Sequence, residues 1–429
     1  MKPERVAWVS ALVVCAALIA APWRGHVDDF DAQMYRVVAR NLARAHAWFD
    51  LRGLPTLHPV FREHLPFGFW PAAAAIRAGS ERAIDPLYAL MTLGAIAASG
   101  AIARRLAGDR AGVAAILLLG TCESIWQYGG RLLLDPPLLL FATASAGMAL
   151  AGRWEWAAVL GGVATLIKGP FGLLPLACVA AVRLRDWRAP AAVAAAIVPF
   201  AVFLAVDPGG GWRSGYFAGQ LLASATGGRG DGVAAWWFPL AVVARRFWPG
   251  LPFLLLAVWA ARRNAALRPL LFACALMLAA LCVPQRKWGN HAYVAFPLLA
   301  ALAGAAAGPL LERIPGKLSV ASTVALAVIA CGLSLSGLGA LVLRPPCPYS
   351  TTLGPALDGI PARSVVLAAG AEPGDLSTLA AERDLVPLSV PAIPADAGVR
   401  DAVARGPVVV PPGWTVTARA GPLAVLRNR

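Results

Sequence analysis

Long apolar runs separated by short basic connections are the feature that most limits what this chain can fold into. Runs of roughly 16–24 residues recur from residue 6 to residue 341, a length that suits helices crossing a bilayer. Hydrophobic residues make up 59% of the 429 residues and charged residues only 14%, far less charge than a soluble protein carries. The sequence therefore predicts an all-α polytopic membrane protein.

About eleven transmembrane helices are expected from these runs. They lie near residues 6–23, 84–103, 111–127, 137–151, 155–167, 170–184, 190–206, 236–260, 269–284, 291–309 and 318–341. Alternate connections carry Arg or Lys, so the positive-inside rule places the N-terminus in the cytoplasm and, with an odd number of spans, the C-terminus outside. The first run also has features of a cleavable signal peptide, but its length favours a retained anchor.

Two outward segments are long, and the end of the chain differs in character. The segments are 24–83 and 207–235; the Gly-rich runs 209–211 and 227–232 in the second predict flexible connections. The prediction is a transmembrane domain over 1–343 and a small α/β domain over 344–429 on the periplasmic side. Within the small domain we expect strands at 365–369, 406–412 and 422–426, and a helix at 376–383.

The strong basic balance has two possible explanations. A net charge of +15 and a pI near 10.3 are compatible with a nucleic-acid partner. The basic residues, however, cluster at the ends of apolar runs, which indicates membrane topology and contact with anionic lipids. We therefore predict membrane lipids and no nucleic acid as partners. The seven cysteines include no C-x-x-C, so neither a zinc site nor a disulfide framework is predicted.

An acidic cluster, Asp28–Asp31, follows the first apolar run. A helix that begins near Asp31 would place this carboxylate on the same apolar face as Tyr35. The opposite face would turn a basic stripe toward water or lipid phosphates, formed by Arg36, Arg40 and Arg44. The acidic residues have an alternative role as helix N-caps, above all Asp28 and Asp29. A carboxylate at the membrane boundary is nevertheless a candidate for a functional site.

More charged residues occur in the outward connections. The stretch F-R-E-H-L-P-F-G-F-W (61–70) brings Glu63 and His64 before aromatic residues, either as a site or as part of an interfacial aromatic belt. Three outward turns place cations at the same membrane face. They contain Arg131 with Asp135, Lys168, and Arg286 with Lys287. A single lysine there would only snorkel to the interface, whereas several cations together would hold the phosphate of a lipid-linked substrate.

In their order and spacing, these motifs resemble the glycosyltransferases that use polyprenyl-phosphate sugars. These form the GT-C fold group, within it the branch of lipid A aminoarabinose transferase and the protein O-mannosyltransferases. The residues that carry the resemblance are Asp31, Ala32, Tyr35, Arg40 and Asn41; Glu63, His64, Pro66, Phe69 and Trp70; the loop A-R-R-L-A-G-D-R-A-G (103–112); Arg131, Asp135, Pro137 and Leu138; Leu166, Lys168, Gly169 and Pro170; and Lys287, His291, Tyr293 and 297–304. Two positions depart from the pattern: Ala32 stands where a glutamate is usual, and Leu65 where the first proline of a pair is usual.

The resemblance implies an inverting glycosyl transfer from a polyprenyl-phosphate donor at the periplasmic face of a bacterial inner membrane. The acceptor would be a hydroxyl or phosphate of lipid A, another glycan or a protein. Asp31 would act as the general base, assisted by Glu63. The donor phosphate and sugar would be bound by Tyr35, Arg40, His64, Arg131, Asp135, Lys168 and Lys287. No cofactor is predicted, and no metal ion is predicted to be required because the cations can neutralise the phosphate.

Two other functions remain open from the sequence alone. A transporter or flippase of lipid-linked sugars would use the same charges along a headgroup pathway, although repeated halves, common in transporters, are missing from this sequence. An inactive member of the family is the second alternative, suggested by Ala32.

Overall fold

The computed structural model describes residues 3–20, 30–54, 58–228, 232–312, 353–394, 399–407 and 409–428. The predicted span 318–341 and the acidic residues Asp28 and Asp29 lie outside these ranges. The chain forms two compact units. The helical unit comprises Met1–Trp23, Arg62–Gly68 and Arg82–Val342; the mixed unit comprises Arg24–Phe61, Phe69–Glu81 and Leu343–Arg429. Each is described by itself.

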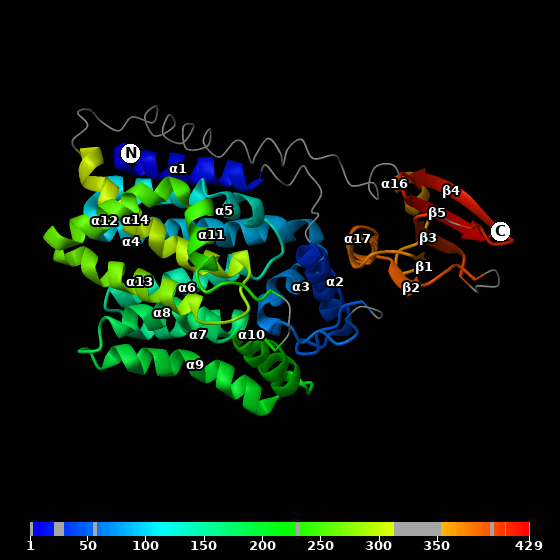
Figure 1. Cartoon of the computed structure of the whole chain (residues 1–429), viewed down its shortest axis with the longest axis horizontal. Coiled ribbons are helices and arrows are strands. Elements are labelled where there is room, and N and C mark those ends of the chain that lie inside the picture. Colours follow the sequence, from blue (N-terminus) through cyan, green and yellow to red (C-terminus); the bar gives the residue numbers. More distant parts are fainter. Residues whose placement is uncertain are drawn as a thin grey trace. The chain divides into compact units, whose positions relative to one another are not determined.

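The helical unit consists almost entirely of helices (Figure 1). They are α1 (Pro3–Ala20), α4 (Ile84–Gly120), α5 (Glu123–Tyr128), α6 (Asp135–Leu150), α7 (Trp154–Lys168), α8 (Pro170–Ala181), α9 (Arg188–Val206), α10 (Ala223–Thr226), α11 (Phe238–Arg246), α12 (Leu251–Arg263), α13 (Arg268–Cys282) and α14 (Phe296–Glu312). The connections contain 3-10 helices and a π-helix. The 3-10 helices are η2 (Pro66–Gly68), η3 (Glu81–Ala83), η5 (Trp248–Gly250), η6 (Ala265–Leu267) and η7 (Gly289–Ala295), and the π-helix is η4 (Trp212–Leu222).

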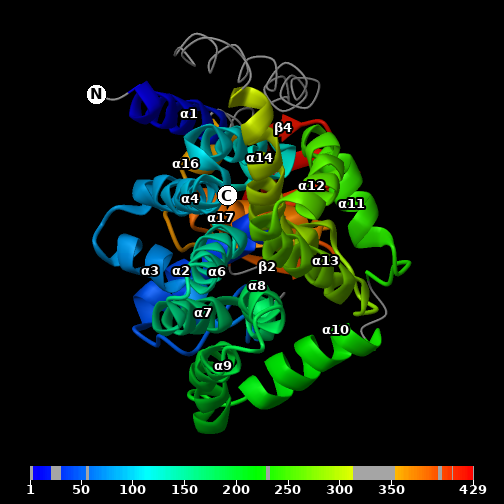
Figure 2. The ribbon, with the colours of Figure 1, turned by 90° about the vertical axis from the view of Figure 1, so that its left-hand side faces the viewer.

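Small residues let α14 pack closely against α4 at the centre of this unit. Every residue from Phe296 to Gly308 is buried. A Cβ at Gly304 would lie 2.7 Å from the carbonyl oxygen of Ala111, so the two backbones approach as closely as they do because Gly304 has no side chain. In the view of Figure 2, α6, α7 and α8 are grouped together, with α9 packed against α7 and α8.

Four helical segments in the described residues are long and apolar enough to cross a membrane: Glu81–Gly120, Arg188–Val206, Ala265–Cys282 and Gly289–Glu312. A bent pair, Phe238–Arg246 with Trp248–Arg263, would make a fifth. The predicted spans 137–151, 155–167 and 170–184 are helices too, but α6, α7 and α8 have only 16, 15 and 12 residues. Since a span needs about 20 residues, the predicted number of eleven is not confirmed.

The basic loop predicted between residues 103 and 111 is a break inside α4. Ala107 and Gly108 have non-helical backbone angles there, and Gly108 has a φ of 86°, which glycine adopts without steric cost. The two spans predicted on either side are therefore helical, separated at the place the motif indicated.

The span predicted at 236–260 is helical and apolar over most of its length, but it is not continuous. The chain instead forms α11 and α12, which meet at a bend of 82°. The sequence Trp248-Pro249-Gly250 lies at the bend. Proline lacks the N–H that would continue α11, and glycine weakens a helix, so the apolar run is interrupted. The glycines 209–211 form a non-helical connection after α9, and the helical segment Trp212–Thr226 follows directly; their flexibility stays a prediction.

The mixed unit combines α2 (Phe30–Ala45) and α3 (Trp70–Arg77) with the C-terminal α/β fold. Its remaining elements are α16 (Gly354–Asp358), β1 (Val365–Ala369), α17 (Pro373–Arg383), β2 (Val386–Val390), β3 (Asp401–Arg405), β4 (Trp414–Ala420) and β5 (Leu423–Asn428). The strands form a five-stranded sheet in the order β2-β1-β3-β5-β4, with β1 parallel to β2 and β3, and β5 antiparallel to β3 and β4.

Alternation along the strands gives the sheet two buried faces. Val366, Val403 and Val425 pack with Leu379 of α17 on one face. On the other face, Leu367, Ala402 and Leu426 pack with Trp414. The predicted strands 365–369 and 422–426 and the helix 376–383 are confirmed. The strand predicted at 406–412 is wrong: Gly406 has a φ of 92° and two prolines, Pro411 and Pro412, lack ladder donors, so this stretch joins β3 to β4.

Candidate functional site

The ion pair between Asp135 and Lys168 is the best-defined part of the candidate site in the helical unit. Lys168 Nζ lies 2.9 Å from Asp135 Oδ1, and the two side chains are only 12% and 10% exposed. Asp135 is the first residue of α6, followed by two prolines that suit a helix start. Lys168 is the last residue of α7. The pair thus joins the beginning of one helix to the end of the next.

Gly169 explains why the chain turns directly after Lys168. Its φ of 61° and ψ of −151° fall in a region that is open almost only to glycine, and Pro170 then begins α8. The hydroxyl of Tyr216 would lie 2.4 Å from a Cβ at this position. The K-G-P turn therefore fixes both the direction of the Lys168 side chain and the approach of the π-helix η4.

Aromatic and cationic side chains extend the site from this ion pair. Lys168 Nζ lies 5.7 Å from the centre of the Phe171 ring, which in turn lies 5.6 Å from the ring of His291. Arg286 precedes His291 in the connection between α13 and α14, and its guanidinium lies 5.6 Å from the Trp288 ring. The connections α7–α8 and α13–α14 are therefore joined through the contacts of Lys168 with Phe171 and of Phe171 with His291.

Lys287, predicted to bind the donor, is hydrogen-bonded to the segment that precedes α11. It is 6% exposed; its Nζ donates to the carbonyl oxygen of Ala234 at 3.3 Å and its backbone N–H to Gly232 at 2.8 Å. Arg131, in the turn before α6, is likewise buried, at 7% exposure. Glu63 and His64 belong to this unit as well and are half-buried.

Sequence reasoning missed Arg246 as part of this region. Its Nη1 donates to the hydroxyl of Tyr293 at 2.6 Å and to Ser124 Oγ at 3.3 Å, and Tyr293 stacks on Tyr128 with ring centres 5.9 Å apart. The sequence contained an indication of this role. Arg246 lies in the middle of the apolar run 236–260, where an ionisable residue is costly and usually serves a function.

The three other predicted site residues belong to the mixed unit. Asp31 is in the first turn of α2 and is exposed, so the expectation that it shares a buried face with Tyr35 is wrong. Tyr35 is 6% exposed and packs edge-on against Phe69 and Phe61, with ring centres 5.3 and 6.2 Å away. An acidic residue in the first turn is favoured by the helix dipole, which explains its place in α2 without a buried partner face.

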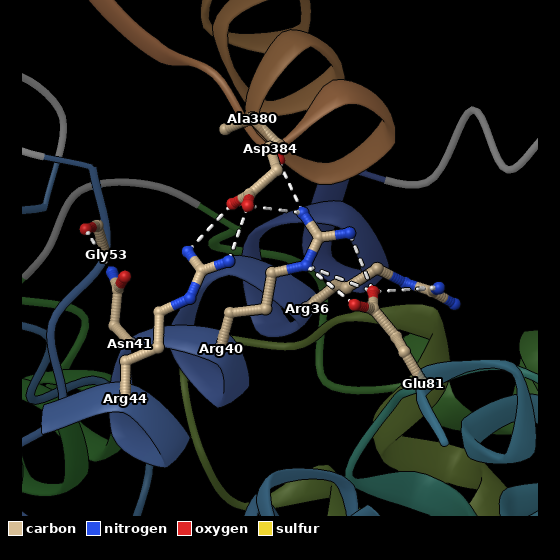
Figure 3. A network of polar contacts seen from close by, with 8 residues as sticks. All are labelled: Arg36, Arg40, Asn41, Arg44, Gly53, Glu81, Ala380 and Asp384. Atoms are coloured by element: carbon tan, nitrogen blue, oxygen red, sulfur yellow. Dashed lines mark hydrogen bonds and ion pairs between the residues drawn. The ribbon is translucent and has the colours of Figure 1, made fainter. Parts of the chain in front are cut away.

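Arg40 has partners that differ from the predicted phosphate. Its guanidinium donates to both carboxylate oxygens of Glu81, at 2.7–3.2 Å, and to the carbonyl oxygen of Ala380 at 2.7 Å (Figure 3). Arg44 forms a bidentate pair with Asp384, at 2.8 and 2.5 Å, and this hydrogen bonding raises the pKa of Arg44 above its ordinary value. Two arginines of the basic stripe, Arg40 and Arg44, therefore bind the C-terminal end of α17, whereas Arg36 lies 3.6 Å from Glu81.

The described residues contain no group of three or more His, Cys, Asp or Glu side chains arranged to hold a metal ion. That no metal is required stays a prediction. The cations around Asp135 and His291 are suited instead to an anionic ligand, because charge-assisted hydrogen bonds to phosphate oxygens are the contacts they can make.

This arrangement of helices and a small sheet is the GT-C fold, which confirms the fold that the resemblance implied. Over 99% of its length the chain is similar to ArnT from Cupriavidus metallidurans, the lipid A aminoarabinose transferase, in crystal structures bound to undecaprenyl phosphate and in the apo state. The TM-scores are 0.70 and 0.72, at 17% identity, with 97% of the ArnT chain covered.

A second similar structure is AglB, the oligosaccharyltransferase from Archaeoglobus fulgidus, in complex with an inhibitory peptide and a dolichol-phosphate. It has a TM-score of 0.55 at 14% identity, with 92% of this chain and 69% of AglB covered. No protein-family model and no curated protein matches the sequence. The identities are too low to transfer an activity, so these similarities establish the fold.

Proposed function

We propose that this protein is an inverting membrane glycosyltransferase. It would move a sugar from a polyprenyl-phosphate donor to a hydroxyl or phosphate on lipid A, another glycan or a protein, at the periplasmic face of a bacterial inner membrane. The observation that carries the proposal is the cation cluster at the outward ends of α7 and α13 within a fold that matches ArnT over 99% of this chain.

The cations would assist the departure of the polyprenyl phosphate from the sugar. When the bond between the sugar and the polyprenyl phosphate breaks, negative charge grows on the departing phosphate. Lys168 and Arg286 would stabilise that charge by fixed hydrogen bonds, with no rearrangement at the moment of reaction. Asp135 would keep Lys168 oriented through their 2.9 Å contact, and its own charge lowers the cost of holding an ammonium group in a buried place.

The other half of the reaction needs a base for the acceptor hydroxyl. We assign this role to Asp31 with Glu63 in support. The exposed position of Asp31 at the start of α2 leaves it accessible to an acceptor in solution or at a lipid surface. General base catalysis typically contributes on the order of 10²–10⁴-fold to a rate.

The test is a transfer assay with the purified full chain in detergent. Radiolabelled polyprenyl-phosphate sugars, as a panel of different sugars, are incubated with membrane extract, and the label is followed by extraction and chromatography. Wild type is compared with Lys168→Met, and with Arg262→Met as a control at an exposed cation of α12 that is not part of the site. Label that moves from lipid to acceptor with wild type and the control, and at least about 100-fold more slowly with Lys168→Met, supports the proposal. Lipid binding without transfer of any sugar would contradict it.

A further inference from the structure

The mixed unit contains a pocket whose lining includes only one of the residues assigned to glycosyl transfer, Arg40. Its volume is about 520 Å³, within the range of small-molecule sites. Three segments line it: α2 with Arg44 and Asn41, the stretch 50–54, and the C-terminal fold with Arg363 and Asp384. Part of this lining is visible in Figure 3.

The lining carries an excess of positive charge. Four arginines and two aspartates contribute to it. Arg44 is held by Asp384, and Arg52 pairs with Asp50 at 2.7 Å while its side chain stays 64% exposed. Across the described chain, no carboxylate pairs with the guanidinium of Arg363. The lining therefore includes an exposed guanidinium, that of Arg363, with which no carboxylate of the described residues pairs.

Arg363 has an unusual backbone. Its φ of 67° is in the left-handed region, where a residue with a side chain is uncommon and glycine is favoured. Its N–H donates to the carbonyl oxygen of Asp384 at 2.6 Å, which holds the turn beside the pocket. Strained conformations of this kind concentrate at sites that bind ligands, so the strained arginine is a second observation that points to one.

Hydrogen bonds and close packing hold the stretch 50–54, which forms another wall of the pocket. Asn41 Nδ2 donates to the carbonyl oxygens of Arg52 and Gly53, at 3.0 Å each. A Cβ at Gly53 would lie 2.9 Å from the carbonyl oxygen of His58, so this stretch cannot accept a larger residue without moving. Guanidinium groups presented from fixed, separate segments match the oxygens of a phosphate, and the remaining volume and polar groups accommodate hydroxyls.

We propose that this pocket binds a phosphate ester of a sugar or polyol, at a site separate from the one proposed for the donor. The ligand's phosphate would contact Arg363 and the free N–H groups of Arg44 and Arg52, and its hydroxyls would meet Asn41 and Asp50. Because both α2 and the C-terminal fold line the pocket, the bound ligand strengthens the packing of one on the other. The proposal is independent of the transferase reaction.

The sharpest variant is Arg363→Gly. It removes the guanidinium and places at this φ the residue that favours it, so the fold is not weakened by the change. Arg419→Ala is the matched control, because Arg419 is exposed on β4, lies outside the pocket and carries the same charge.

Binding is measured on the full chain by isothermal titration calorimetry. Glucose 6-phosphate, glucose and inorganic phosphate are titrated in detergent. The same chain is then placed in nanodiscs of phosphatidylcholine with or without phosphatidylglycerol, whose headgroup is a polyol phosphate. Binding of glucose 6-phosphate in detergent indicates a soluble ester. Competition with it only in discs that contain phosphatidylglycerol indicates the lipid headgroup.

The expected result is a dissociation constant about tenfold higher for Arg363→Gly than for wild type and Arg419→Ala, which bind alike. Three results would overturn the proposal: equal binding by wild type and Arg363→Gly, an equal loss in Arg419→Ala, or inorganic phosphate binding as tightly as either ester, which would mean an adventitious ion only.

Discussion

Asp135 and Lys168 start one helix and end the next, and their side chains meet at 2.9 Å in a place where both are about nine-tenths buried. Removing one partner leaves the other as a buried charge without compensation. We expect Lys168→Met or Asp135→Asn to lower the free energy of unfolding by about 3 kcal/mol, and the double variant to lose less than the sum. Thermal unfolding in detergent, measured for wild type, the two single variants and the double variant, gives these losses of stability. Additive losses would show that the pair is not coupled.

Arg40 and Arg44 provide a contrast in burial on one helix. The Arg40 side chain is 10% exposed and binds Glu81 and the end of α17, whereas the Arg44 side chain is 39% exposed and binds Asp384. Arg40→Met should therefore destabilise the mixed unit by about 2 kcal/mol, because Glu81 and a helix carbonyl lose their donor. Arg44→Met should cost less than about 1 kcal/mol after solvent screening. The protease sensitivity of the full chain measures the loss of stability in each variant. An equal increase in sensitivity for Arg40→Met and Arg44→Met would contradict the predicted difference.

A comparison of alanine variants at Gly169 and Gly152 distinguishes the cost of backbone strain from the cost of a steric clash. Both have positive φ, 61° and 75°, but a Cβ at Gly169 would meet the Tyr216 hydroxyl at 2.4 Å, while nothing lies within 4 Å of one at Gly152. Gly152→Ala should cost about 1 kcal/mol from backbone strain alone. Gly169→Ala should cost more, and should also impair transfer because Lys168 precedes it. The unfolding midpoints and transfer rates of the two variants test this; a Gly169→Ala protein as stable and active as Gly152→Ala would show that the close packing with Tyr216 is unimportant.

Local patterns predicted much of the fold, and the failures have physical causes. The break at Gly108 and the turn at Gly169 were predictable because glycine and the neighbouring charges mark them in the sequence. The bend between α11 and α12 was not predicted, although Pro249 and Gly250 lie there. The residues on both sides are apolar, so the hydropathy of the run is continuous across the bend. The number of membrane spans is not confirmed, because hydropathy alone does not distinguish a short buried helix from a helix that crosses the membrane.

The site shows the same division. The cations in the connections between helices were predicted from their types and spacing, and Lys168 and Asp135 do form an ion pair. The stripe of arginines on α2 was assigned to water or lipid phosphates because helix periodicity identifies a face but not its neighbour. The partner of that face, α17, is about 340 residues further along the chain, as the Arg40–Ala380 hydrogen bond shows. Such long-range pairing leaves no trace in a local pattern.

Asp31 tests the central claim most directly. The measurement is the single-turnover rate of sugar transfer, with donor binding measured in parallel, for wild type, Asp31→Asn and Asp109→Asn. Asp109 pairs with Arg104 at 2.7 Å within the break of α4 and is the matched control. The account predicts that Asp31→Asn transfers on the order of 10²–10⁴-fold more slowly with donor affinity unchanged, while Asp109→Asn behaves as wild type. Equal transfer by all three proteins would contradict the role of Asp31, and donor binding without transfer by any of them would contradict a transferase.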